Sequence, residues 1–324
     1  MAHADATGYR TRPVTNSGGT TMAATIILEN DQLRLVIAPA AGASVVALER
    51  RWAGAWLPIL RPTPAADIEA GNSSAMASFV LAPFSNRIRD ARFRFAGRTF
   101  ALVPNTPEGH AIHGDVRKRP WTVVAQSAER LRCAFASRAH ADIAFPVPYE
   151  SSLEARLEAD TAVLELALRN VGTTPMPAGL GHHPYFRRTL LDPGEQVALA
   201  ATLAAVYEGL LPEGPPRALH PEEDFSRSRA LPTHGFDNCF AGFAGHARML
   251  WPGSGIGLDL SADPVFSHAI LFTPPDQPFF AFEPVSHVND GFNLMARGIA
   301  GTGVVVLAPG EGLTGRISFR IGPA

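Results

Sequence analysis

Residues 92–102 spell RFRFAGRTFAL, and this stretch sets the fold class. Phe93 and Phe95 alternate with arginines, the chain turns at Ala96-Gly97, and apolar residues recur on the return arm. Alternation with a period of two, broken by a short turn that contains glycine, is typical of a β-hairpin with one apolar face. The stretch therefore indicates antiparallel β-structure.

The sequence on both sides of this hairpin continues the pattern. Leu33, Leu35 and Ile37 alternate with polar or smaller neighbours, which is the period of a strand with one buried face. Similar short segments follow along the chain, at residues 44–48, 121–124, 131–135, 152–157, 162–168, 197–203, 249–251, 256–260, 269–272, 279–282, 303–307 and 316–321.

Helical periodicity is nearly absent. The best helix candidates are short, at residues 64–70 and 221–225. The 29 glycines and 28 prolines occur without a repeat, as expected for many strands joined by many turns. We therefore predict an all-β, antiparallel fold that forms a single domain over residues 23–324, preceded by a flexible tail over residues 1–22.

Composition limits the possible functions. Of the 324 residues, 46% are apolar and 18% are charged, so a large core is possible. The net charge of −2 provides no basic field for nucleic acid. Neither a signal peptide nor an apolar run long enough for a membrane span is apparent. Cys133 and Cys239 are far apart in sequence and are interpreted as free thiols. We expect a cytoplasmic protein, monomeric or homodimeric, without a nucleic-acid or membrane partner.

Polar clusters interrupt the apolar rhythm and supply the candidate site residues. An Asn-Arg pair after an apolar strand is usually a solvated strand end, and a histidine beside glycine is usually a surface or capping residue. A glutamate inside an apolar strand is harder to explain, because buried carboxylates are rare unless they are paired or functional. The candidates are Asn86, Arg87, His113, His182, His183, Tyr185, Asp237 and Glu283.

Several kinds of chemistry can be weighed against these residues. His182 and His183 are adjacent, so in a strand they point to opposite faces and cannot easily share a metal ion. A Gly-x-Ser-x-Gly elbow for a nucleophilic serine is missing, and the glycines after Pro252 precede no helix that would bind a phosphate. We therefore expect no metal and no cofactor. An imidazole and a carboxylate, which can transfer protons near neutral pH, are left as the candidate pair.

The clusters, taken in order, resemble the motifs of the aldose 1-epimerases. Each motif alone is weak, but six in the right order are strong together. The matching stretches are Asn86-Arg87-Ile88, Ile112-His113-Gly114, His183-Pro184-Tyr185-Phe186, Asp237, Glu283 and Leu307-Ala308-Pro309-Gly310-Glu311.

The resemblance implies a β-supersandwich and a cofactor-independent isomerase that acts on a sugar. By this resemblance, Glu283 is the general base on the C1 hydroxyl and His183 the general acid on the ring oxygen. His113, Arg87 and Asp237 bind the substrate. Asn86 supports Arg87, and Tyr185 supplies an apolar platform for the sugar.

Two departures from the family pattern leave the substrate open. His182 stands where galactose-acting members often have asparagine, and the segment from Glu283 to His287 resembles the branches that do not act on galactose. Basic residues beside the motifs also allow a hexose 6-phosphate, although a solvated rim is their plainer interpretation. They are Arg89, Arg117, Lys118, Arg119, Arg187 and Arg188. A catalytically silent sugar-binding domain on the same fold is the alternative from another class.

Overall fold

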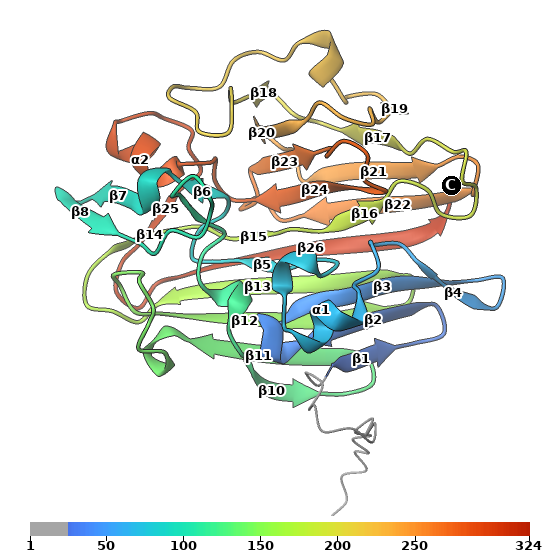
Figure 1. Ribbon diagram of the computed structural model, residues 1–324, viewed down its shortest axis with the longest axis horizontal. Helices are drawn as coiled ribbons and strands as arrows, with labels where there is room; N and C mark the ends of the chain where they lie inside the picture. Colours follow the sequence, from blue (N-terminus) through green and yellow to red (C-terminus); the bar gives the residue numbers. More distant parts are fainter. Residues whose placement is uncertain (1–24) are drawn as a thin grey trace, which may run out of the picture.

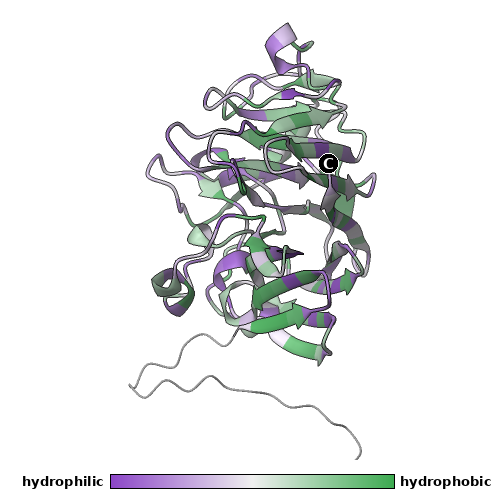
Figure 2. Cartoon of the chain, turned by 90° about the vertical axis from the view of Figure 1, so that its right-hand side faces the viewer, coloured by the Kyte–Doolittle hydropathy of each residue, from purple (hydrophilic) through white to green (hydrophobic). Residues whose placement is uncertain are grey.

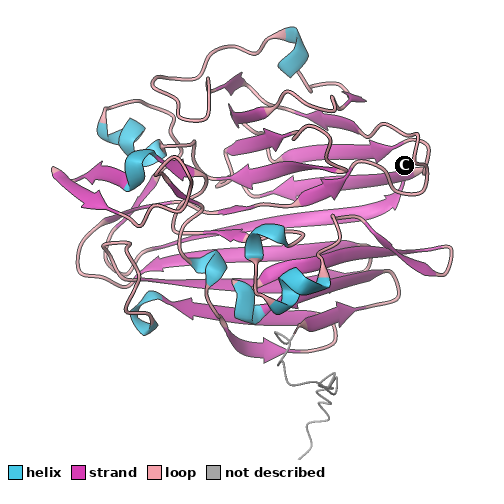
Figure 3. Ribbon diagram, in the orientation of Figure 1, coloured by secondary structure: helices cyan, strands magenta, loops and turns pink. Residues whose placement is uncertain are grey.

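The computed structural model describes residues 25–324, and the predicted tail over residues 1–22 lies outside them. Figure 1 shows stacked antiparallel sheets, and Figure 3 shows that the helices are few, short and peripheral. The all-β prediction is confirmed. None of the described helices is long and apolar enough to cross a membrane.

Most of the strands belong to three sheets, in which every strand pairing is antiparallel. The four-stranded sheet contains, in order, β1 (Ile26–Glu29), β2 (Leu33–Ala38), β3 (Ser44–Trp52) and β4 (Ala55–Pro58). The nine-stranded sheet contains β10 (Thr122–Gln126), β11 (Arg130–Ala136), β12 (Tyr149–Glu158), β13 (Thr161–Asn170), β26 (Gly312–Pro323), β22 (Ile256–Ala262), β21 (His246–Trp251), β17 (Ala198–Ala201) and β19 (Arg229–Ala230).

The third sheet carries the candidate site. It contains β18 (Ala205–Val206), β20 (Asp237–Ala241), β23 (His268–Phe272), β24 (Phe279–Val285), β15 (Gly181–His182) and β5 (Val80–Leu81), with β16 (Tyr185–Arg187) also paired to β24. Three short pairs complete the strands: β6 (Arg87–Ile88) with β9 (Ala111–Ile112), β7 (Arg92–Phe95) with β8 (Arg98–Ala101), and β14 (Met176–Ala178) with β25 (Val305–Leu307). The helices are α1 (Ala65–Glu69) and α2 (Gly291–Ala296).

Side-chain alternation separates two layers of the core. Phe280 and Phe282 of β24 lie in the main core, which also contains residues of the nine-stranded sheet. Ala281 and Val285, on the other face of β24, belong to a smaller cluster with Tyr185. Figure 2 shows the corresponding alternation of hydrophobic and hydrophilic residues along the strands. Because alternate residues of a strand point to opposite faces, Glu283 lies on the face of the smaller cluster.

The hairpin predicted from residues 92–102 is present as β7 and β8, with Phe93 opposite Phe100. Both short helix candidates are also confirmed: α1 lies within residues 64–70, and residues 221–223 form a single 3-10 turn. The α2 helix has no counterpart among the predictions, because its six residues are too few to establish a period of 3.6.

Candidate active site

A histidine and a glutamate meet on the outer face of the third sheet. His183 Nε2 lies 3.1 Å from Glu283 Oε1, although the two residues are 100 positions apart in the sequence. Both side chains are buried, with exposed fractions of 7% and 2%. The other carboxylate oxygen of Glu283 has no hydrogen-bond partner in the part of the chain that the structure describes. An imidazole and a carboxyl group at this distance can pass a proton directly.

Burial shifts both members of this pair away from their charged forms. It raises the pKa of Glu283 well above its ordinary value, and the nearby charge of Asp237 raises it further, while Arg87 opposes the shift. Burial likewise lowers the pKa of His183 well below its ordinary value, assisted by the positive charges of Arg61 and Arg117. The carboxyl group of Glu283 therefore titrates closer to neutral pH than a free carboxyl group does.

The His183 ring is held between two aromatic side chains. Its centroid lies 4.7 Å from that of Phe79 and 4.4 Å from that of Tyr185, with both rings tilted against it. The hydroxyl of Tyr185 lies 3.4 Å from His183 Nε2, and burial raises the pKa of Tyr185 to about 12. The guanidinium of Arg61 covers the Tyr185 ring at 3.4 Å from its centroid. Because the Tyr185 ring contacts Arg61 and His183, it is a poor candidate for a platform that packs against a sugar. The Tyr185 hydroxyl is the better candidate for a role in the site, and that role is polar.

His113 and Asn86 come from neighbouring segments and hold each other. The backbone nitrogen of His113 donates to Asn86 O at 2.9 Å, and the backbone nitrogen of Asn86 donates to His113 Nδ1 at 3.2 Å. Because Nδ1 accepts, the neutral ring carries its proton on Nε2. Both residues have positive φ angles, 48° for Asn86 and 66° for His113, which are uncommon away from glycine. The His113 ring lies edge-on to His183, with 5.2 Å between centroids.

Asn86 also orients Arg87. Its side-chain oxygen accepts hydrogen bonds from the backbone nitrogen of Arg87 at 2.8 Å and from Arg87 Nη1 at 3.3 Å. Arg87 lies close enough to Asp237 and Glu283 to lower the pKa of each carboxyl group, against the upward shift that burial causes. One end of the site is therefore a mixed cluster of one guanidinium and two carboxyl groups.

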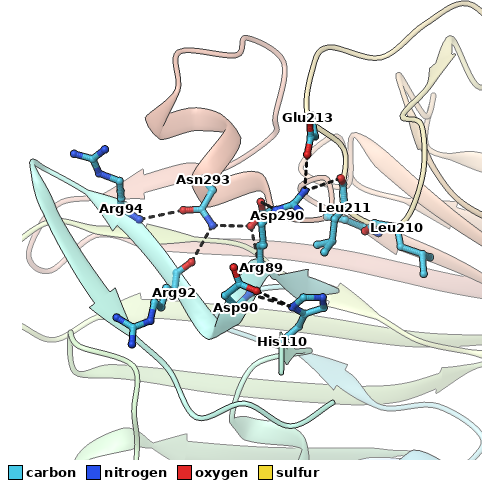
Figure 4. A network of polar contacts seen from close by, with 11 residues as sticks. Arg89, Asp90, Arg92, Arg94, His110, Leu210, Leu211, Glu213, Asp290 and Asn293 are labelled. Atoms are coloured by element: carbon cyan, nitrogen blue, oxygen red, sulfur yellow. Dashed lines mark hydrogen bonds and ion pairs between the residues drawn. The ribbon is translucent and has the colours of Figure 1, made fainter. Parts of the chain in front are cut away.

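A polar network fixes the segment that carries Arg87 (Figure 4). The backbone nitrogen of Asp290 donates to Arg87 O at 2.7 Å, and the Asp290 carboxylate accepts from Arg89 N at 3.0 Å and from Asn293 Nδ2 at 2.7 Å. Arg89 Nη2 in turn donates to Leu211 O at 3.0 Å. The network therefore joins β6 to α2 and to the loop that contains Leu211. These bonds hold the backbone of Arg87 in place.

Two further buried histidines, His182 and His287, have hydrogen-bond partners outside the pair. His182 forms a 2.5 Å contact with the hydroxyl of Ser78, and burial lowers its pKa to about 3. His287 Nε2 accepts from Ser85 N at 3.0 Å, and burial lowers the pKa of His287 to about 4. Within residues 25–324, no group of three or more His, Cys, Asp or Glu side chains is arranged to hold a metal ion.

The structure thus brings the candidates other than His182 into one site, with two omissions and one correction. Phe79 and Arg61 were not among the candidates, because neither lies in a recognisable motif. The solvated-rim interpretation is wrong for Arg117, whose exposed fraction is 4%. Arg119 is ion-paired with Asp142 at 2.7 Å.

Comparisons with known proteins agree with this fold. The sequence profile of the aldose 1-epimerase family matches residues 24–320, and the chain belongs to this family. It is 29% identical over 286 residues to the uncharacterized protein YphB of Escherichia coli K12, which covers 82% of this chain and 89% of the relative. It is 25% identical over 257 residues to the uncharacterized protein YihR of the same organism, covering 75% and 77%.

Solved structures show the same architecture. A candidate aldose 1-epimerase of E. coli K12 superposes with a TM-score of 0.79 at 28% identity, covering 93% of this chain and 99% of the other. A galactose mutarotase-like protein of Clostridium acetobutylicum gives a TM-score of 0.81 at 18% identity, covering 93% and 95%. The family and the galactose mutarotase-like fold, both expected from the sequence motifs, are therefore confirmed.

Proposed function

We propose that this protein is a mutarotase, an isomerase that interconverts the α and β anomers of a hexose or related aldose without a cofactor. The observation that carries the proposal is the buried contact of 3.1 Å between His183 Nε2 and Glu283 Oε1. A sugar-binding domain without activity needs no buried acid and base, and such a pair is costly to bury unless it is used.

The proposed reaction balances with one mobile proton on the pair. Ionised Glu283 takes the proton of the C1 hydroxyl, the bond between C1 and the ring oxygen breaks, and protonated His183 gives its proton to that oxygen. The open aldehyde rotates about C1–C2. Glu283 then returns its proton to the carbonyl oxygen as the C5 hydroxyl, deprotonated by His183, attacks either face of C1. Arg87, Asp237 and the Nε2–H of His113 hydrogen-bond the sugar oxygens.

The proposal is tested by NMR exchange spectroscopy or polarimetry on freshly dissolved α-glucose and α-galactose. Acceleration of anomer exchange by the wild-type protein is the expected result. A protein that binds these sugars, glucose 6-phosphate or glucuronate, yet accelerates anomer exchange of none of them, would instead be a carbohydrate-binding domain.

We predict a bell-shaped dependence of kcat/KM on pH. The active pair holds one proton, so activity falls at low pH when the pair binds a second and at high pH when it loses the last. The lowered pKa of His183 places the acid limb well below 6.5, and the raised pKa of Glu283 places the alkaline limb well above 4.5. A rate that rises through pH 6.5 to a plateau would contradict the one-proton assignment.

Asn86→Ala is expected to raise KM about tenfold with a smaller effect on kcat, because Arg87 and His113 lose the partner that orients them. Steady-state kinetics at saturating and limiting sugar separate the two constants. Asn105→Ala, which removes side-chain bonds to Ile112 in the same region, is the matched control and should leave KM closer to the wild-type value. Equal effects of the two substitutions would contradict the orienting role.

A further inference from the structure

Two arginines flank the His183 side of the site, and neither has a carboxylate partner within 4 Å in the described residues. The Arg61 guanidinium lies over the ring of Tyr185, and that of Arg117 lies 5.1 Å from the centroid of Phe79. Tyr185 and Phe79 are the two rings that enclose His183. Each guanidinium group therefore lies against an aromatic ring that itself contacts His183, the acid of the proposed pair.

The two guanidinium groups converge on one residue, Ser74. Arg61 Nη2 donates to Ser74 O at 2.7 Å, and Arg117 Nη1 donates to the hydroxyl of Ser74 at 2.6 Å. Arg61 also donates to Met76 O through Nη2, at 2.8 Å, and through Nε, at 3.2 Å. Arg117 Nε is buried and has no hydrogen-bond partner among residues 25–324. Arg61, Arg117 and Ser74 thus form an arginine cluster in which two positive charges are fixed side by side. The N–H donor at Arg117 Nε remains without an acceptor in the described residues.

Such an arrangement of two buried positive charges is unfavourable by itself. Arginine stays charged under all ordinary conditions, and buried charges are normally paired. Here burial lowers the pKa of both Arg61 and Arg117, and their charges also lower that of His183. The neighbouring Arg119 differs, since it is ion-paired with Asp142 at 2.7 Å. The two guanidinium charges, together with the Nε–H of Arg117 that has no partner in the described residues, match the oxygens of a phosphate or carboxylate group.

We propose that Arg61 and Arg117 bind an anionic group on C6 of the sugar, so that the substrate is an aldose carrying a phosphate or carboxylate at that carbon. This inference rests on the proposed function, in which His183 protonates the ring oxygen. The ring oxygen is bonded to C5, and C5 carries C6. A substituent on C6 therefore lies beside His183, whereas the C1 hydroxyl lies toward Glu283 at the other end of the pair.

A bound anion would also prepare His183 for its role. Besides burial, the charges of Arg61 and Arg117 oppose protonation of His183, because both arginines repel a third positive charge. An anion held between them cancels that repulsion and raises the pKa of His183 toward its ordinary value. The acid limb of kcat for an anionic sugar should therefore lie at higher pH than the acid limb for its neutral parent.

The test compares anomer exchange of glucose, glucose 6-phosphate and glucuronate in wild type, Arg61→Gln, Arg117→Gln and the control Arg119→Gln, with the spontaneous rate of each sugar subtracted. We expect wild-type kcat/KM to be at least about tenfold higher for one of the anionic sugars than for glucose. That ratio should fall about tenfold to a hundredfold in R61Q or R117Q and stay unchanged in R119Q. The two anionic sugars distinguish a phosphate from a carboxylate.

Equal or better use of glucose by the wild type, or a ratio that R61Q and R117Q leave unchanged, would overturn the anionic assignment while the mutarotase proposal stood. If neither variant folds, competition decides on the wild type: inorganic phosphate must inhibit exchange of the anionic sugar, and failure to inhibit overturns the inference. If no sugar is turned over, the proposed function fails separately. The melting temperature is then measured in phosphate and in chloride at equal ionic strength. A rise in phosphate that R117Q loses supports anion binding by Arg61 and Arg117, and the absence of a rise in the wild type overturns it.

Discussion

Glu283→Gln is expected to reduce the rate of anomer exchange by about 10² to 10⁴, the usual contribution of one general acid–base group. Glutamine keeps the size of the side chain but cannot accept the proton of the C1 hydroxyl. The loss should appear in kcat, because the hydroxyl-binding residues Arg87 and Asp237 are untouched. Exchange NMR on the best substrate measures it directly. A variant with more than half of the wild-type kcat would exclude Glu283 as the base.

The same variant should not lose stability, which separates a chemical effect from misfolding. The folded pKa of Glu283 is raised, so the stability that this carboxyl contributes is fully present below its unfolded pKa and is lost as the pH rises through the folded value. Glutamine carries no such penalty. We therefore expect the melting temperature of E283Q at neutral pH to equal or exceed that of the wild type, measured by circular dichroism.

Much of the fold could be predicted from the sequence because its signals are local. The alternation of Leu33, Leu35 and Ile37 depends only on one strand having one buried face, and β2 has this burial pattern. The hairpin of β7 and β8 needs only a turn at Ala96-Gly97. Strand order is different: β26 lies between β13 and β22, which are more than 80 residues apart, and periodicity contains no information on that pairing.

The site shows the same division. Residue type and position within motifs selected His113, His183 and Glu283, but only the fold of the third sheet brings His183 to Glu283. Arg61 carried no signal, because it follows β4 in a proline-rich segment. Only the fold brings it to Tyr185, through the backbone bond from Arg61 N to Tyr185 O and the contact of its guanidinium with the ring. Arg117 was visible in the sequence, but the burial that makes it informative is a property of packing.

The charge arrangement of the site links its geometry to its chemistry. At the Glu283 end, burial and then the charge of Asp237 raise the pKa of Glu283, while Arg87 opposes the shift. At the other end, burial and then the charges of Arg61 and Arg117 lower the pKa of His183. Both effects favour the neutral forms of the acid and the base, which is the protonation state of the open-chain intermediate in the proposed reaction. In the proposed reaction, burial and these charges therefore lower the free energy of the open-chain sugar bound to neutral His183 and Glu283, relative to the closed sugar bound to their charged forms.

His183→Asn is expected to lower kcat by about 10² to 10⁴, because the ring oxygen loses its proton donor while the asparagine amide can still hydrogen-bond it. The matched control is His182→Asn: His182 is equally buried and adjacent, but its ring contacts Ser78 on the other side of the strand. H182N should cost stability with kcat within a few fold of the wild type. The acid limb of the pH profile should also shift or vanish in H183N and persist in H182N, because that limb belongs to the His183–Glu283 pair. Equal losses of kcat in the two variants, with both limbs unchanged, would mean that burial of the histidines, and not proton transfer by His183, limits the rate.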